Sequence, residues 1–187
     1  MPVARNTLPI VQNGIYHIYN GAIGNEKLFS SKTDYRKFLD YIKEFVLPHV
    51  SVYAYCLLPN HFHFLLQVNS IAMKFSKSMS DACNKYAKNA NTKYNRRGGL
   101  FIRPFKRKLI EDDAALAWIT WYIHRNPLHH GLTKDWQNWP WSSYKAYTGN
   151  YSTVLETKFL IDFFGGREQL IAHHQLNLQG FIDEGMG

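Results

Sequence analysis

Residues 50–68 read VSVYAYCLLPNHFHFLLQV, which is two apolar runs joined by Pro59-Asn60. Each run is rich in the β-branched and aromatic residues that favour strands, and a Pro-Asn pair is typical of a turn. We therefore predict a strand over residues 50–57, a turn, and a second strand over residues 61–68 that pairs with the first as a hairpin.

Further predicted strands and helices flank this hairpin. In chain order the sequence predicts a strand over residues 14–20 (GIYHIYN), a helix over residues 32–47, the hairpin, a helix over residues 70–94, a basic strand over residues 100–110 and a helix over residues 112–125. Pro104 interrupts the basic strand, which favours an edge position because proline cannot donate to a neighbouring strand. This order predicts an α+β fold of the ferredoxin-like kind, a sandwich in which a central antiparallel sheet carries helices on one face.

The chain has 187 residues, a length that suits one domain with a short appendage. Hydrophobic residues make up 45% and charged residues 19%, which provides enough apolar material for a core and excludes a disordered tail. We place a boundary near Asn150, between a domain over residues 1–150 and a tail over residues 151–187. Within the tail, residues 153–164 and 167–176 favour two short C-terminal helices.

The charge balance is basic. There are 22 Lys and Arg residues against 14 Asp and Glu, which gives a formal net charge of +8 and a sequence pI near 9.4. A basic surface favours polyanionic partners, nucleic acid first and an anionic membrane surface second. A basic enzyme with an ordinary solvated surface has the same composition, so charge alone leaves both interpretations open.

Cysteine usage and hydropathy indicate a cytoplasmic protein. Cys56 and Cys83 are the only cysteines, and they form neither a CxxC pair nor a disulfide framework, which favours a reducing compartment. The N-terminal sequence MPVARNTLPI lacks the apolar run of a signal peptide, and no stretch approaches the roughly 20 apolar residues of a membrane span. We therefore expect a protein of the cytoplasm, associated with the nucleoid, with no membrane partner.

The second strand of the hairpin carries two histidines, His61 and His63. Side chains alternate between the two faces of a strand, so these imidazoles project together while Phe62 and Phe64 face the core. Paired imidazoles are common metal ligands, and burying two of them without partners is costly. The sequence therefore favours a metal site here, and the alternative is a pair of surface histidines on a half-exposed strand.

A second constellation lies on the helix that contains Tyr122. Trp118, Tyr122 and Asn126 follow one another at intervals of four residues, so they share one stripe of this helix. If that stripe overlooks the histidine pair, the Asn126 carbonyl becomes a third ligand and the Tyr122 phenol stands beside the metal. With an ordinary pKa of about 10, a phenol needs a metal or a base to act as a nucleophile. The alternative is that Tyr122 is one more aromatic residue of the core.

At these two segments the sequence resembles a known family. LLPNHFHFLL (57–66) is similar to the His-hydrophobic-His (HUH) signature of single-tyrosine transposases, and WYIHRNPLHHGL (121–132) is similar to their tyrosine helix. The branch it resembles is the bacterial transposases associated with repetitive extragenic palindromes (REP). GIYHIYN, DYRKFL, FIRPFKRKLI and WPWSSYKAYTG match as well, so the resemblance spans residues 14–149. One departure is that Gly21-Ala22 follows YHIYN, where the family commonly has Arg-Gly, so a basic DNA contact is missing there.

The resemblance implies an HUH nuclease fold and a transposase that cuts and rejoins hairpin-containing single-stranded DNA. It implies that His61 and His63 ligate Mg²⁺ or Mn²⁺, with Asn126 at the matching third position. It also implies that Tyr122 attacks a DNA phosphate, which leaves a 5′-phosphotyrosine link and a free 3′-OH. Some relatives are dimers that share active sites and others are monomers, so a homodimer is one expectation.

Basic side chains just before the tyrosine helix are our candidates for contacting DNA. They are Arg96, Arg97, Arg103, Lys106, Arg107 and Lys108, together with Arg125 on the helix itself. Such side chains neutralise phosphates and position a strand without reading its sequence, and the interleaved Phe101 and Phe105 offer faces for base stacking. The alternative is a solvated edge strand, since charges there also discourage aggregation.

Two other functions remain open at this point. One is a domesticated relative that grips structured nucleic acid without cutting it, although the complete set of His61, His63, Tyr122 and Asn126 argues against that. The other is a zinc hydrolase built on the histidine pair, which needs a third strong ligand and a glutamate base. The sequence contains no H-E-x-x-H helix, so this function ranks last.

Overall fold

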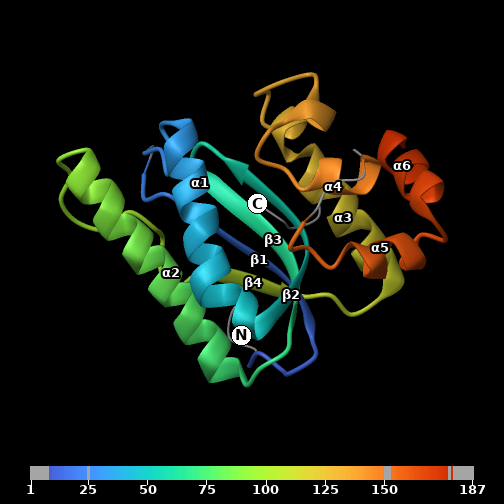
Figure 1. Cartoon of the computed structure of the whole chain (residues 1–187), viewed down its shortest axis with the longest axis horizontal. Helices are drawn as coiled ribbons and strands as arrows, with labels where there is room; N and C mark the ends of the chain where they lie inside the picture. Colours follow the sequence, from blue (N-terminus) through green and yellow to red (C-terminus); the bar gives the residue numbers. More distant parts are fainter. Residues whose placement is uncertain (1–8, 25, 150–152, 177, 179–187) are drawn as a thin grey trace, which may run out of the picture.

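The computed structural model describes residues 9–24, 26–149, 153–176 and 178 (Figure 1). Its strands are β1 (Ile15–Gly21), β2 (Val50–Leu58), β3 (His61–Val68) and β4 (Lys106–Leu109). Its α-helices are α1 (Lys32–Tyr41), α2 (Ala72–Lys93), α3 (Asp113–His129), α4 (Tyr144–Thr148), α5 (Thr157–Phe163) and α6 (Arg167–Gln175). A π-helical turn (Ile42–Val46) and a 3₁₀ turn (Leu47–His49) extend α1, and another 3₁₀ turn covers Trp136–Asn138.

The four strands form one antiparallel sheet in the order β2-β3-β1-β4. The predicted hairpin is confirmed, because β2 and β3 pair along their length with Leu58 opposite His61 next to the turn. β4 lies at the sheet edge, as Pro104 predicted, but it is shorter than residues 100–110. With α1 after β1 and α2 after β3, this topology confirms the predicted ferredoxin-like α+β class.

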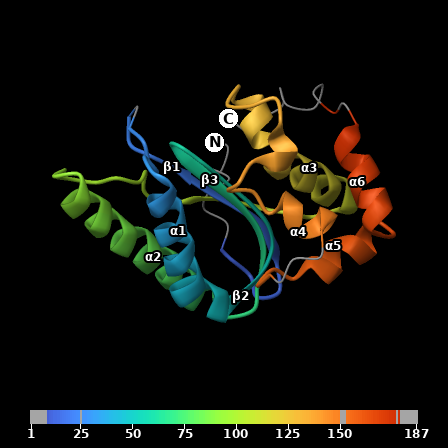
Figure 2. The same ribbon diagram turned by 45° about the horizontal axis from the view of Figure 1, so that its top comes forward.

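Helices cover both faces of the sheet, which corrects the expectation of helices on one face. α1 and α2 pack together on one face, while α3 packs on β2 and β3 from the other and is followed by α4, α5 and α6 (Figure 2). The physical reason is that the second face is also apolar, since Ala54, Cys56 and Leu65 are fully buried there. The sheet therefore separates two cores, and α3 lies directly over the strand that carries the histidines.

Strand alternation explains which side chains each core receives. Phe62, Phe64 and Leu66 of β3 point into the core under α1 and α2, together with Ile18 of β1. Burying side chains of this size stabilises the fold by roughly 1.5–3 kcal/mol each. His61 and His63 alternate with these residues along β3, so they must face α3, as the alternation predicted.

α3 is longer than its sequence suggested. We expected the helix to end at Asn126-Pro127, but it runs to His129 and contains Pro127. The segment after Asn126 stays helical because the His130 amide donates to the Asn126 carbonyl and the Leu132 amide donates to the Pro127 carbonyl. The predicted start is confirmed, since the Asp112 carboxylate caps the helix by accepting from the Ala115 amide at 2.7 Å. The extra turn brings His129 and His130 to the site.

The predicted tail helices are present as α5 and α6, and Leu160 and Leu170 from them are buried in the same core as α3. The proposed boundary at Asn150 lies outside the described residues, so the division into residues 1–150 and 151–187 stays a prediction. Within the described part of the chain, no helix combines the length and apolarity that crossing a membrane requires. Cys56 and Cys83 are both buried free thiols.

A buried chain of hydrogen bonds fastens α6 to α3. His174 Nδ1 donates to the Leu170 carbonyl at 2.8 Å, so its Nε2 accepts from His124 Nδ1 at 2.8 Å. His124 Nε2 then accepts from the Ser143 hydroxyl, also at 2.8 Å. Both imidazoles are fully buried, and burial lowers the pKa of His174 to about 4. These hydrogen bonds therefore require both histidines to be neutral.

This arrangement predicts that acid weakens the attachment of α6. The pKa of His174 is lower in the folded protein than its unfolded value near 6.5, so its contribution is complete above pH 6.5 and is lost as the pH falls toward 4. We expect the native chain to have a higher free energy of unfolding than His174→Phe at pH 7. This difference between the two proteins should be smaller at pH 4. The change is on the order of 3 kcal/mol, measured by urea unfolding. A difference that does not change with pH would contradict this assignment.

Candidate metal and tyrosine site

His61 and His63 project from one face of β3 toward α3, with their ring centres 5.1 Å apart. His63 is buried and His61 is partly exposed. His61 also faces the ring of His130 at 4.5 Å, from the residue that follows α3. The two histidines predicted to share a face do so, and one end of the pair is open to solvent.

α3 places Tyr122 beside these histidines. The ring of Tyr122 meets the ring of His63 edge-on, with centres 5.7 Å apart. It is held between Trp118 one turn earlier and His129 at the end of the helix, with ring centres at 4.9 Å and 5.6 Å respectively. Only 9% of Tyr122 is exposed, and burial raises the pKa of its phenol. The ring is therefore clamped in one position next to the imidazoles.

Asn126 lies one helical turn after Tyr122 and is completely buried. Its amide nitrogen donates to the Tyr122 backbone carbonyl at 3.1 Å. This bond fixes the orientation of the amide, and it leaves the side-chain oxygen Oδ1 buried without a hydrogen-bond partner in the protein. Burial dominates the pKa values of both neighbours, lowering that of His61 and raising that of Tyr122, and the nearby Asn126 side chain partly offsets each shift. The four residues singled out in the sequence thus converge.

His17 of β1 is a member of the site that the sequence did not reveal. Its Nε2 lies 2.8 Å from His63 Nδ1, and the two rings are stacked with centres 5.1 Å apart. His17 is buried, and burial together with the charge of Lys108 lowers its pKa to about 3. It is therefore neutral near pH 7 and able to accept the proton of His63 Nδ1.

The hydrogen bonds at the two Nδ1 atoms leave both Nε2 atoms free as electron-pair donors. His61 Nδ1 donates to the side-chain oxygen of Asn60 at 2.7 Å. We assign the proton between His63 Nδ1 and His17 Nε2 to His63, which then donates it to His17 at 2.8 Å. A metal-bound histidine ordinarily uses its second nitrogen in this way, which fixes the tautomer and the ring orientation. Burial is the main reason that the pKa of His61 falls to about 4 and that the pKa of His63 lies well below its usual value, so both imidazoles are neutral near pH 7.

These residues fit a divalent cation by their own chemistry. His63 Nε2 and Asn126 Oδ1 are both buried acceptors that lack a hydrogen-bond donor from the protein. A buried polar atom without a partner costs about 1–3 kcal/mol, and coordination of a cation removes that cost. Among the described residues, no group of three His, Cys, Asp or Glu side chains is placed to hold a metal. The donor set therefore needs the asparagine, which disfavours the zinc hydrolase.

We predict that His17 acts as a positioning residue for His63. His17→Phe keeps the ring but removes the acceptor, so Mn²⁺ affinity measured by calorimetry should fall by roughly 10- to 100-fold. Nitrogen NMR of His63 should show that the Nδ1-protonated tautomer no longer dominates. His17→Gln, which restores an acceptor oxygen, should recover part of the affinity. Unchanged Mn²⁺ affinity and an unchanged His63 tautomer in His17→Phe would refute the role.

The predicted DNA-contacting residues fall into groups with different surroundings. Lys106 lies over the Tyr19 ring at 5.6 Å, and Lys108 is near enough to His17 to affect its pKa, so both flank the site. Arg103 donates to the Asn84 side chain at 2.5 Å on the other side of the sheet. Arg107 lines a cavity on that side, and Arg97 is exposed in the turn after α2.

The structure gives other positions in that set an internal role. Arg96 forms an ion pair with Glu26, and its guanidinium also donates to Asn91 at 2.9 Å. Arg125 lies 5.1 Å from the ring centres of both Trp121 and Trp136 and donates to the His174 carbonyl at 2.9 Å. These contacts connect α3 to the C-terminal helices, so DNA contact by Arg125 stays an untested prediction.

Two aromatic side chains differ from the expectation. Phe101 and Phe105 were expected to offer faces to DNA bases, but both are buried in the core under α1 and α2. They point inward because the segment that carries them packs its apolar side chains against α2, while the three residues between them, Ile102, Arg103 and Pro104, are exposed.

Comparisons with known proteins agree with the resemblance seen in the sequence. Over 102 residues the chain is 33% identical to a protein of Haemophilus influenzae that is named as a REP-associated tyrosine transposase. The match covers 49% of this chain and 57% of that relative, so the chain spans little more than half the relative's length. No protein-family model matches the chain.

A solved structure shares the fold. It is described as a REP-associated tyrosine transposase bound to a REP hairpin, and it superposes with a TM-score of 0.66 at 17% sequence identity. The superposition covers 83% of this chain and 94% of that one. The chain therefore shares the fold of that structure, and the predicted resemblance to REP-associated tyrosine transposases is confirmed by a named relative.

Proposed function

We propose that this protein is a metal-dependent, single-tyrosine DNA transposase that cleaves and rejoins single-stranded DNA carrying hairpins. One observation carries the proposal: Tyr122 meets His63 beside two buried acceptors, His63 Nε2 and Asn126 Oδ1, that have no donor in the protein. Structural histidines are normally satisfied by their neighbours, as His124 and His174 are. Unsatisfied acceptors that face a clamped phenol indicate a site built for a cation and a phosphate.

Three side chains would hold the cation, which we propose to be Mg²⁺ or Mn²⁺. They are His61 and His63 through Nε2 and Asn126 through Oδ1, all neutral, so the cation keeps its full charge toward the substrate. When bound, the cation supplies positive charge that stabilises the developing charge on a scissile phosphate. His17 and Asn60 hold the two imidazoles in the required tautomer. Mn²⁺ suits a site with two imidazoles better than Mg²⁺ does.

Tyr122 is the proposed nucleophile. Its phenol oxygen forms a bond to phosphorus, the bond from phosphorus to the 3′ oxygen breaks, and the phenol proton is passed on so that a 3′-hydroxyl leaves. The products are a 5′-phosphotyrosine link and a free 3′ end, and reversing the step rejoins DNA without ATP. Trp118 and His129 hold the ring, which limits the orientations from which the phenol attacks.

Hairpin DNA is the proposed substrate. The net charge of +8 favours a polyanion, and Lys106 and Lys108 lie on the edge strand next to the site. The solved structure that shares the fold is bound to a REP hairpin. The position of the basic residues beside Tyr19 and His17 suits a strand that approaches the tyrosine along β4.

The direct test is formation of the covalent intermediate. The full chain is incubated with labelled hairpins that carry single-stranded flanks and with Mn²⁺, and the products are separated on a denaturing gel. The proposal expects a slowly migrating protein–DNA adduct that requires the metal. DNA binding without an adduct, at every metal and flank tested, would instead support the non-catalytic binding module.

A further inference from the structure

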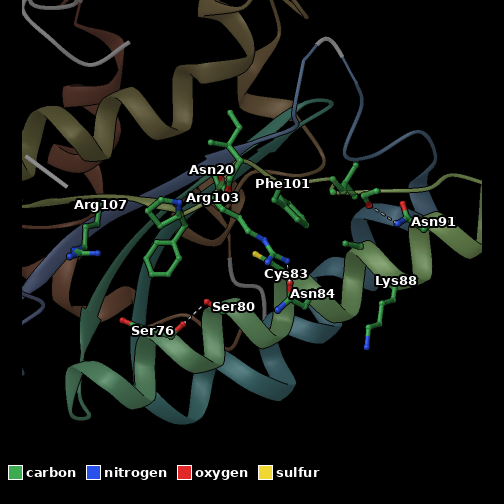
Figure 3. Close-up of a pocket in the computed structure, with 17 residues that line it drawn as sticks. Asn20, Ser76, Ser80, Cys83, Asn84, Lys88, Asn91, Phe101, Arg103 and Arg107 are labelled. Carbon is green, nitrogen blue, oxygen red and sulfur yellow. Dashed lines mark hydrogen bonds between the residues drawn. The ribbon is translucent and has the colours of Figure 1, made fainter. Parts of the chain in front are cut away.

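Tyr19 of β1 is a second tyrosine next to the proposed site. In the sheet it pairs with His63 of β3 on one side and with Lys106 of β4 on the other. The residue that follows it, Asn20, lines a cavity on the face of the sheet that carries α2 (Figure 3). Because side chains alternate along a strand, Tyr19 faces α3, as His63 does.

Tyr19 shares two imidazole neighbours with Tyr122. Its ring stacks on that of His17 with centres 4.6 Å apart and on that of His63 with centres 5.8 Å apart. The Tyr122 ring meets the same two rings edge-on, with centres 6.5 Å from His17 and 5.7 Å from His63. Burial is the main cause that raises the pKa of Tyr122, and the nearby Tyr19 adds to this shift. The two phenols are therefore close neighbours within one site.

The two tyrosines differ in their access to solvent. Only 9% of Tyr122 is exposed, whereas Tyr19 is half-buried. No side chain or backbone group in the described part of the chain makes a hydrogen bond to the Tyr19 hydroxyl. A phenol has an ordinary pKa of about 10, and burial raises that of Tyr19, so the hydroxyl keeps its proton near pH 7. Tyr19 therefore offers a hydrogen-bond donor between the solvent and Tyr122.

The surroundings of Tyr19 suit a phosphate. The Lys106 ammonium lies 5.6 Å from the centre of the Tyr19 ring, and Lys108 follows on the same face of β4. Gly21, the next residue of β1 on this face, pairs with His61 and has no side chain. A Cβ built on Gly21 would lie 3.5 Å from its nearest neighbouring atom, so the backbone leaves room there. An anion thus meets positive charge on one side of Tyr19 and open space on the other.

We propose that Tyr19 is a further catalytic residue, whose hydroxyl donates a hydrogen bond to a non-bridging oxygen of the phosphate that Tyr122 attacks. The inference rests on the proposed function, because it assigns a second contact to the same phosphate. Tyr19 keeps its proton and forms no bond to phosphorus. Its hydrogen bond holds the phosphate in line with the Tyr122 oxygen and stabilises negative charge in the transition state. Lys106 draws the phosphate to this position by its charge.

The first test measures the rate of adduct formation in single turnovers. The full chain is mixed in excess with Mn²⁺ and a labelled hairpin that carries single-stranded flanks. Tyr19→Phe keeps the ring that stacks on His17 and removes only the hydroxyl. We expect its rate at saturating protein to fall by roughly 100-fold, the order lost when one donor to a transition-state oxygen is removed. Its affinities for Mn²⁺ and for the hairpin should stay close to those of the native chain.

Tyr55→Phe is the matched control. Tyr55 of β2 is also a half-buried tyrosine, but it packs against the core under α1 and α2, on the opposite face of the sheet. This variant loses the same hydroxyl and should form the adduct at the native rate.

A sulfur substitution in the DNA separates contact with the phosphate from a structural role. Each diastereomer of a phosphorothioate at the cleaved phosphate replaces one non-bridging oxygen by sulfur, a weak hydrogen-bond acceptor, and keeps the negative charge. For one diastereomer, the loss of rate caused by sulfur should be roughly tenfold smaller in Tyr19→Phe than in the native chain, because the variant has no hydrogen bond to lose. For the other diastereomer, both proteins should show the same loss.

Three results would overturn the inference while leaving the proposed function intact. They are equal adduct rates in Tyr19→Phe and Tyr55→Phe, equal sulfur effects in Tyr19→Phe and the native chain for both diastereomers, and a loss of rate in Tyr19→Phe that is matched by a loss of Mn²⁺ affinity. No adduct from the native chain would overturn the proposed function and this inference together. An adduct that peptide mapping places on Tyr19 instead of Tyr122 would do the same for both assigned roles.

Discussion

Replacing Tyr122 with phenylalanine is expected to abolish the covalent protein–DNA adduct and to lower DNA cleavage by roughly 10⁴-fold or more, the order lost when an enzyme loses its nucleophile. Phenylalanine preserves the ring that Trp118 and His129 hold in place, so the site should keep its shape. Affinity for hairpin DNA and for Mn²⁺ should therefore remain close to that of the native chain. Cleavage is measured on denaturing gels, and folding is checked by thermal unfolding.

A matched control is available on the other face of the sheet. Tyr41 of α1 is also a buried tyrosine, and Tyr41→Phe removes the same hydroxyl from a position that packs in the core under α1 and α2. This variant should cleave like the native chain. A metal-dependent adduct that persists in Tyr122→Phe would show that another residue is the nucleophile and would refute the proposed chemistry.

Replacing His63 with alanine is expected to produce the second-largest effect. It removes a direct ligand, so Mn²⁺ affinity should fall by more than about 100-fold, because loss of an outer-shell partner alone costs roughly 10- to 100-fold. Cleavage should fall at least as far, while binding of hairpin DNA should change little because basic side chains supply most of it. Calorimetry with Mn²⁺ and the adduct assay measure the two quantities on the same preparation.

The control for this variant is His49→Ala. His49 lies in the 3₁₀ turn before β2, away from the proposed site, and the substitution makes the same change of side chain. We expect native Mn²⁺ affinity and native cleavage from it. If His63→Ala binds Mn²⁺ as tightly as His49→Ala does, the cation is not held by β3 and the ligand assignment is wrong.

Alternation along single elements explains why much of this site was predictable from sequence. Because strand side chains alternate, His61 and His63 had to share a face once Phe62 and Phe64 entered the core. Because a helix repeats every 3.6 residues, Tyr122 and Asn126 had to share a stripe. The hairpin, the edge position of β4 and the ferredoxin-like order followed from the same local rules.

What local rules cannot supply is which elements become neighbours. His17 sits in GIYHIYN, and its role depends on β1 pairing with β3, which brings together residues 46 positions apart. A histidine inside an apolar strand was a signal of a functional residue, but the sequence did not show which residue His17 contacts. For the same reason the inward orientation of Phe101 and Phe105 and the packing of Arg125 between two tryptophans required the fold.

The most direct measurement is an anomalous difference map from crystals of the protein grown with Mn²⁺. Our account predicts a strong peak within coordination distance of His61 Nε2, His63 Nε2 and Asn126 Oδ1, adjacent to the Tyr122 ring. A manganese peak elsewhere in the protein, with only water bound to those three atoms, would contradict it.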